Sequence, residues 1–226
     1  MSQPIQYPRM PPSSDQLVCD DGEPMESARH RQQMTILVES LEFAWRSRDD
    51  FYVGGNMYLY FSETQARQND FRGPDVFVVL DTTRRERRAW VVWEENGQRP
   101  DVVIELLSDK TEHVDRGEKM GIYARALKVG EYFLFDPFSG VFEGYDLDLH
   151  HGSYVRKALD DVGRLRCEQL DLFLAKVRGT LYGVETDWLR WVANDGRVLE
   201  MPIERADAET ERANRLAAEL AALKQK

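Results

Sequence analysis

Acidic residues stand in or beside two apolar, β-branched segments of the sequence. Asp75 opens the segment PDVFVVLD, and Asp101 and Glu105 lie in RPDVVIELLSDK. Side chains alternate between the two faces of a strand, so Asp101 and Glu105 share a face. A charged carboxylate in such a strand is costly unless something compensates it. A divalent cation held between Asp75 and Glu105 would do so, and oxygen ligands suit Mg²⁺ or Mn²⁺.

The elements that must position these acids can be outlined from periodicity. In residues 25–48, Met34, Leu37, Leu41 and Trp45 recur at helical spacing, a pattern that extends back to His30 and Glu26 and predicts an amphipathic helix. Residues 49–63 predict a strand pair or one bent strand, in which Gly54 and Gly55 mark a bend or a close backbone approach.

Further elements follow along the chain. Residues 74–81 predict a strand, and the Asn96-Gly97 dipeptide predicts a hairpin between the strands on either side of it. Residues 113–127 predict a helix that breaks at Gly130, and residues 131–137 predict a buried strand. From 138 to 200, short strand-like pieces predict an antiparallel extension of the sheet. The fold class is therefore mixed α/β, with a central mixed sheet flanked by helices.

The C-terminal segment changes character from about Ala206. One seam of a heptad repeat is formed by Ala206, Ala213 and Leu220, and the other by Glu209, Leu216 and Leu223. The pattern predicts a helix that either packs on the rest of the chain or pairs with a second copy as a short coiled coil in a homodimer. We expect a flexible lead-in over 1–19, a main domain over 20–200 and this helix over 201–226.

Composition excludes several classes of protein. The chain has 226 residues and a hydrophobic share of 42%, enough for a packed core, and no apolar run of membrane-spanning length. Its net charge of −10 argues against a broad basic surface for nucleic acid. The basic cluster at 82–88 is expected to be a solvated loop. Cys19 and Cys167 lack metal-type spacing, and the N-terminal segment lacks the apolar stretch of a secretory signal, so we expect a cytoplasmic protein.

The stretch from GPDVFVVLD through RPDVVIELLSDKTEHVDRGEKMGIY to EYFLFDP resembles a restriction endonuclease family that is abundant in cyanobacteria. The resemblance runs from about residue 20 to 182. That family is assigned to the PD-(D/E)xK nuclease superfamily, which implies a restriction-endonuclease-like core. It also implies phosphodiester hydrolysis of DNA by a water activated by Mg²⁺ or Mn²⁺.

The resemblance assigns roles to particular residues. Asp75 matches the aspartate of the PD motif and Glu105 the acid of the (D/E)xK motif, both as metal ligands. The motif lysine is absent, because Leu107 stands in its place. Lys119 matches a family lysine on the following helix and would position the attacking water, with Lys110 as a second candidate. Further contacts to metal or substrate are expected from an accessory group: the backbone carbonyl of Leu106, Glu26, His30, Ser108 and Asp101.

Structural explanations compete with each of these roles. Asp75 could cap a turn, Glu105 could form a structural ion pair with Lys119 or Arg116, and His30 could be a hydrogen-bonded histidine at the edge of the core. If these explanations hold, the chain is a catalytically impaired nuclease fold that serves as a binding or assembly module through its C-terminal helix.

Overall fold

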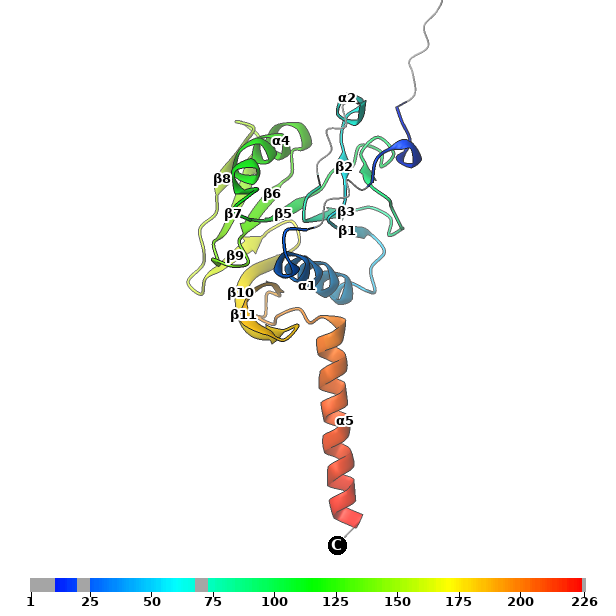
Figure 1. Cartoon of the computed structure of the whole chain (residues 1–226), viewed down its shortest axis with the longest axis vertical. Coiled ribbons are helices and arrows are strands. Elements are labelled where there is room, and N and C mark those ends of the chain that lie inside the picture. The colour runs from blue at the N-terminus through cyan, green and yellow to red at the C-terminus, as the bar shows by residue number, and fades with distance from the viewer. Residues whose placement is uncertain (1–10, 20–24, 68–72, 225–226) are drawn as a thin grey trace, which may run out of the picture.

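A computed structural model describes residues 11–19, 25–67 and 73–224. Its centre is a six-stranded mixed sheet (Figure 1). In spatial order the strands are β1 (Phe51–Gly55), β3 (Val76–Leu80), β5 (Val102–Leu106), β6 (Glu131–Phe135), β7 (Phe142–Asp148) and β8 (Ser153–Arg156). The strands β5 and β6 run parallel, and the other neighbours run antiparallel. The predicted mixed α/β class is confirmed.

One face of this sheet packs against α1 (Ala28–Ala44) and a second sheet of three strands (Figure 1). The second sheet consists of β9 (Arg164–Cys167), β10 (Leu172–Leu181) and β11 (Val184–Val192). The helix is tied to it by the buried Gln33 side chain, which donates to the Leu189 carbonyl and accepts from the Leu189 amide. The predicted antiparallel extension therefore holds for β7 and β8 but is wrong for β9 to β11, which fold back over α1.

The opposite face of the sheet is covered by the helical segment 112–127. This segment comprises α3 (Glu112–Val114), a π-helical turn (Asp115–Lys119), α4 (Met120–Ile122) and a second π-helical turn (Tyr123–Leu127). Tyr123 and Leu127 pack on Val103 and Tyr132 of the sheet. The predicted helix is confirmed. It ends at Lys128, which has a positive φ of 53°, before it reaches Gly130.

The predicted hairpin around Asn96-Gly97 is wrong. The residues before it form only a two-residue strand, β4 (Trp90–Val91), which pairs in parallel with β2 (Leu59–Tyr60) in a separate small sheet. Asn96 and Gly97 do have positive φ values, but Gly97 donates to the carbonyl of Val92 and closes a turn over residues 92–97. The chain therefore turns back before a second strand can pair with β4.

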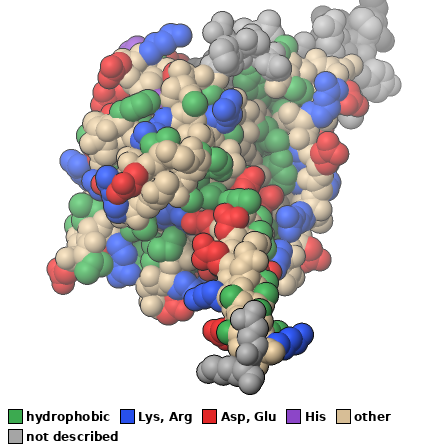
Figure 2. Space-filling model, turned by 60° about the horizontal axis from the view of Figure 1, so that its bottom comes forward, with side chains coloured by type: hydrophobic (Ala, Val, Ile, Leu, Met, Phe, Trp, Pro, Cys, Tyr) green, Lys and Arg blue, Asp and Glu red, His purple; other side chains and the backbone are tan. Residues whose placement is uncertain are grey.

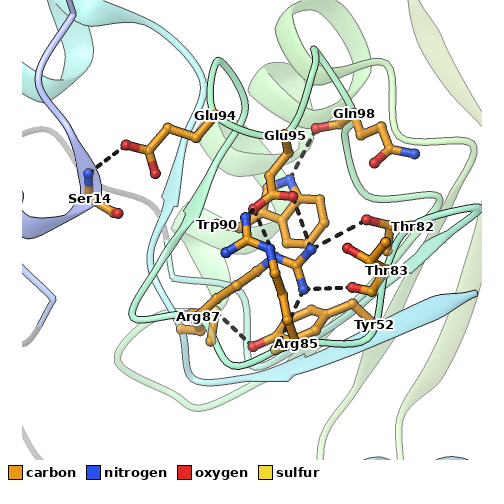
Figure 3. Close-up of polar contacts among 11 residues, drawn as sticks. Ser14, Tyr52, Thr82, Thr83, Arg85, Arg87, Trp90, Glu94, Glu95 and Gln98 are labelled. Atoms are coloured by element: carbon orange, nitrogen blue, oxygen red, sulfur yellow. Dashed lines mark hydrogen bonds and ion pairs between the residues drawn. The ribbon is translucent and has the colours of Figure 1, made fainter. Parts of the chain in front are cut away.

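Two arginines of the basic cluster at 82–88 bind Glu95, a residue of the same turn. Arg87 is buried and donates to both carboxylate oxygens of Glu95, while its guanidinium lies 4.8 Å from the Tyr52 ring and 4.7 Å from the Trp90 ring (Figure 3). Arg85 reaches the same carboxylate at 2.5 Å. The expectation of a solvated loop is thus wrong for Arg87, whose charge is compensated inside the fold.

At the paired glycines, an aromatic side chain lies close against the backbone of β1. A Cβ atom at Gly54 would lie 2.2 Å from Cε1 of Phe77 on the neighbouring strand β3. A side chain at this position would therefore displace the ring of Phe77 on β3, the strand that begins directly after Asp75.

The expectation of a flexible lead-in over 1–19 falls partly on residues 1–10, which lie outside the described residues. Residues 11–19 contact the rest of the fold, and a short 3₁₀ turn, Ser14–Gln16, lies among them. The Pro12 carbonyl accepts from the indole of Trp93, and the Val18 carbonyl accepts from the hydroxyl of Tyr60.

The helix α5 (Pro202–Lys224) projects from the body, and none of its residues is buried (Figure 1). Its first turn is held to the body by Glu204, whose carboxylate accepts from Arg190 at 3.0 and 2.6 Å. Figure 2 shows acidic side chains gathered where α5 leaves the body. No helix in the described part of the chain is long and apolar enough to cross a membrane.

Candidate active site

The register of β3 and β5 brings Asp75 and Glu105 together. Val76 pairs with Ile104 in this antiparallel ladder. The same register continued by one residue sets Asp75 opposite Glu105, and residues directly opposite each other in an antiparallel pair point to the same face. Both residues therefore lie at one end of the ladder, on the face that the helical segment 112–127 covers.

Reciprocal hydrogen bonds fix the two carboxylates. The amide of Leu106 donates to Oδ2 of Asp75 at 2.7 Å, and the amide of Asp75 donates to Oε2 of Glu105 at 3.3 Å. Glu105 thus accepts from the backbone of Asp75 itself, and Asp75 accepts from the residue that follows Glu105. Glu105 is fully buried, whereas Asp75 keeps some exposure at the mouth of the site.

The helical segment 112–127 supplies a cation to this pair. Nζ of Lys119 lies 3.1 Å from Oε2 of Glu105 and 2.8 Å from Oδ1 of Asp115. The Lys119 side chain is 19% exposed, so part of it remains in contact with solvent. Two carboxylates, those of Glu105 and Asp115, therefore contact this ammonium, and Asp75 lies close enough to be influenced by its charge.

Asp115 and Tyr123 were not among the predicted site residues. The hydroxyl of Tyr123 donates to Oε1 of Glu105 at 2.8 Å, and Asp115 is held by its ion pair with Lys119. These two residues and Lys119 follow one another at intervals of four along the sequence. That spacing places side chains on one helical face, and it is the signal that could have identified them.

Burial has the largest effect on the pKa values of the two strand acids, Asp75 and Glu105. It raises the pKa of Asp75 to about 6 and that of Glu105 to about 8, although Lys119 favours the charged form of both. Burial alone would lower the pKa of Lys119, but Glu105 and Asp115 outweigh it and hold that pKa above its ordinary value. One ammonium is too little positive charge for the carboxylates around it, so a further cation would stabilise their ionised forms.

Leu107 explains why the motif lysine is absent. Its side chain is 2% exposed and packs in the apolar cluster that contains Trp90, Tyr123 and Leu134. A lysine in this environment would lose the hydration of its ammonium. Lys119 provides the positive charge from the helix instead, whereas Lys110 is an exposed residue beyond the end of β5.

His30 lies next to the site as a hydrogen-bonded histidine at the edge of the core. Its Nε2 is 3.0 Å from the Leu107 carbonyl, which can only accept, so Nε2 carries the proton. Its Nδ1 is 2.8 Å from the hydroxyl of Ser27, which caps α1. Both ring nitrogens have partners, and His30 therefore ties the start of α1 to the end of β5.

The remaining accessory residues divide into two groups. Glu26 lies before α1 starts rather than on its inward stripe, and it is exposed; its Oε1 is 3.5 Å from the hydroxyl of Ser108, which also contacts Thr111 at 2.9 Å. Asp101 lies at the opposite end of β5, where its Oδ2 accepts from the Leu80 amide at 2.7 Å. Asp101 therefore takes no part in the arrangement around Glu105.

The donor set can be tested against a divalent cation. Within the described ranges, no group of three or more histidine, cysteine, aspartate or glutamate side chains is arranged to hold a metal ion. A pair of carboxylates nevertheless matches Mg²⁺, which commonly binds one or two carboxylates and keeps several waters. Asp75 and Glu105, with the excess of negative charge around them, fit such an ion.

Comparison with known protein families gives a match. A family model named Uma2 and described as "Putative restriction endonuclease" matches residues 5–172. The chain belongs to the Uma2 family. The match spans both Asp75 and Glu105 as well as Lys119, so the whole candidate site lies inside the Uma2 region.

A solved structure also resembles this chain. The crystal structure of a "putative nuclease belonging to DUF820" from Anabaena variabilis is similar at 14% identity and a TM-score of 0.48. That match covers 66% of this chain and 80% of the other. The comparison with curated proteins gives no match.

Proposed function

We propose that the chain is a metal-dependent endonuclease that hydrolyses phosphodiester bonds of DNA. One observation carries the proposal: Glu105 and Asp115 both contact the ammonium of Lys119, and Asp75, next to Glu105, is influenced by the same charge, so that among the described residues three acids depend on one ammonium. A scaffold has no need of such an excess of buried negative charge, whereas a nuclease uses it to bind a cation. Membership of the Uma2 family, with its restriction endonuclease description, supports the same reaction class.

Asp75 and Glu105 would hold Mg²⁺ or Mn²⁺, with the backbone carbonyl of Leu106 as a further oxygen ligand. The ion would supply a Lewis acid for the scissile phosphate and lower the pKa of a bound water. Tyr123 keeps Glu105 oriented through its hydroxyl, and the Leu106 amide does the same for Asp75.

Lys119 would act directly on the phosphate. Its ammonium, on a side chain that is partly exposed, can neutralise the charge that develops on the phosphoryl oxygens, because a fixed cation in a site with little water stabilises the transition state strongly. Asp115 is a positioning residue that keeps hold of Lys119 when Glu105 turns to the metal.

The test is cleavage of plasmid DNA by the purified protein with Mg²⁺ or Mn²⁺. Glu105→Gln and Asp75→Asn should each lower the rate at least 100-fold, as removal of a transition-state contact does. Asp101→Asn is the matched control, because Asp101 lies on the same strand at its far end and should be dispensable. Cleavage that survives both site substitutions would disprove the proposal.

A second candidate function is assembly through α5. This helix has no buried residue, and Leu216, Leu220 and Leu223 are 50%, 59% and 69% exposed along one stripe. Helices that lack a packing partner are marginally stable in water. A second copy would cover the stripe in a parallel pair, in which Glu219 of one helix faces Lys224 of the other. A homodimer of this kind is compatible with either an active or an impaired site.

A further inference from the structure

A cleft of about 550 Å³ opens beside the candidate active site. Its lining includes His30, Ser108, Lys110 and Phe138. The end of β5 connects it to the site: the Leu106 amide binds Asp75, the Leu107 carbonyl binds His30, and Ser108 lines the cleft. From Glu105 to Ser108 is roughly 10 Å of extended chain. A polymer whose phosphate lies at the site would therefore have its neighbouring unit within reach of the cleft.

Phe138 is an exposed aromatic ring that lines this cleft and stands on a backbone turn fixed by hydrogen bonds. It is 66% exposed, although it lies in a tight turn after β6. Oδ1 of Asp136 accepts from the amides of Phe138 and Ser139 at 2.8 and 3.2 Å, which fixes the turn. The guanidinium of Arg29 lies 5.5 Å from the ring centroid and donates to the Pro137 carbonyl. An exposed ring held in this way is suited to stack on a nucleobase.

The acidic residues that line the cleft favour a base over a phosphate as its occupant. Glu26, Asp109 and Asp136 contribute acceptor oxygens to the lining and would repel a phosphate inside the cleft. They can instead accept from the amino groups of a base. Lys110 is exposed at the rim and forms no ion pair with any residue that the structure describes, so it is free to meet a phosphate.

We propose that this cleft binds one unpaired nucleotide, with its base stacked on Phe138 and a phosphate at Lys110. The identification of the ligand as nucleic acid rests on the proposed function. A base inside a duplex cannot reach Phe138 without leaving its stack. The substrate would then be single-stranded, or a duplex with an unpaired segment next to the bond that is cut.

The experiment measures binding without cleavage. Glu105→Gln protein is titrated into a fluorescein-labelled DNA single strand of about 12 nucleotides, a length within the range bound by single-strand sites, and into the matching duplex. Fluorescence anisotropy should show tighter binding of the single strand. Phe138→Ala in the same background should weaken that binding roughly tenfold, the loss of one stacked base.

Lys110→Ala should weaken binding and lower the slope of log affinity against log salt by about 0.7, the loss of one phosphate contact. The controls lie at the other end of the sheet. Leu149→Ala removes an equally exposed apolar side chain and Arg99→Ala an exposed charge, and both should leave the affinity unchanged. Thermal unfolding of each variant checks that the fold is intact.

The inference is overturned if folded Phe138→Ala protein binds the single strand as tightly as its parent, or if neither DNA binds. Its failure is separable from that of the proposed function. Single-strand binding that depends on Phe138, without metal-dependent cleavage by the wild type, supports the cleft and removes the nuclease. Metal-dependent cleavage that Phe138→Ala leaves unchanged on single strands supports the nuclease and removes the cleft.

Discussion

Nζ of Lys119 lies 3.1 Å from Oε2 of Glu105, which joins a helix to the central strand of the sheet. The superfamily pattern places the lysine two residues after the acid, on the same strand. In this chain a positive charge next to the acid comes from the covering helix, while Leu107 fills the strand position with an apolar side chain. The chain can therefore lack the motif lysine and still have an ammonium beside Glu105.

Replacing Lys119 by methionine should abolish cleavage. The change removes the only ammonium near Glu105 among the described residues, and loss of such a transition-state contact lowers the rate at least 100-fold. Stability should fall by less than the roughly 3–5 kcal/mol typical of a broken buried pair, because the raised pKa of Glu105 lets it take up a proton. Urea unfolding and plasmid cleavage measure the two effects. Lys119→Arg, which keeps the charge, is the control; full activity of Lys119→Met would contradict this role.

Placing the motif lysine at position 107 should not improve cleavage. Leu107→Lys places an ammonium in an apolar cluster, so the free energy of unfolding should fall by about 3 kcal/mol or more. The volume-conserving Leu107→Met should cost less than about 1.5 kcal/mol. Denaturant unfolding compares the two. If Leu107→Lys rescues cleavage in the Lys119→Met background, our explanation of the missing lysine is wrong.

The anchor of α5 should weaken in acid. Burial alone would raise the pKa of Glu204, but its hydrogen bonds from Arg190 lower it below the ordinary value of 4.5. A group whose pKa is lower in the folded state stabilises the fold above its unfolded pKa and loses that contribution as pH falls through the folded value. The wild type should therefore lose more stability between about pH 5 and 3 than Glu204→Gln. Parallel thermal unfolding curves for the two proteins across this range would refute the expectation.

Self-association should depend on the leucine stripe of α5. Leu220→Asp places a charge in the seam and should convert a dimer to a monomer, measured as molar mass by light scattering. Asn214→Asp adds the same charge outside the predicted seam and should leave the mass unchanged. A wild-type protein that is monomeric at the concentrations tested would remove the homodimer.

The principal elements could be predicted from periodicity because their apolar patterns are long and regular. The helix around Leu37 and Leu41 and the strands that contain Val78, Ile104 and Phe133 all agree with the structure. The antiparallel register that sets Asp75 opposite Glu105 could not be predicted, since it depends on how distant segments pair.

The errors have physical causes of the same kind. Asn96 and Gly97 have positive φ values, as turn residues do. The ion pair between Glu95 and Arg87, however, holds this loop in an arrangement other than a hairpin. Asp115 shares a helical face with Lys119 and Tyr123, but that spacing alone does not show that the face meets Glu105. Its role emerges only once its ion pair with Lys119, which also contacts Glu105, is known.

Direct binding of Mn²⁺ to the metal-free protein, measured by calorimetry, is the sharpest test of the site. If Asp75 and Glu105 hold a cation jointly, the wild type binds one ion and Asp75→Asn and Glu105→Gln each weaken binding at least tenfold, whereas Asp101→Asn does not. A wild type that binds no ion, or binding that is equal in all four proteins, would contradict the account.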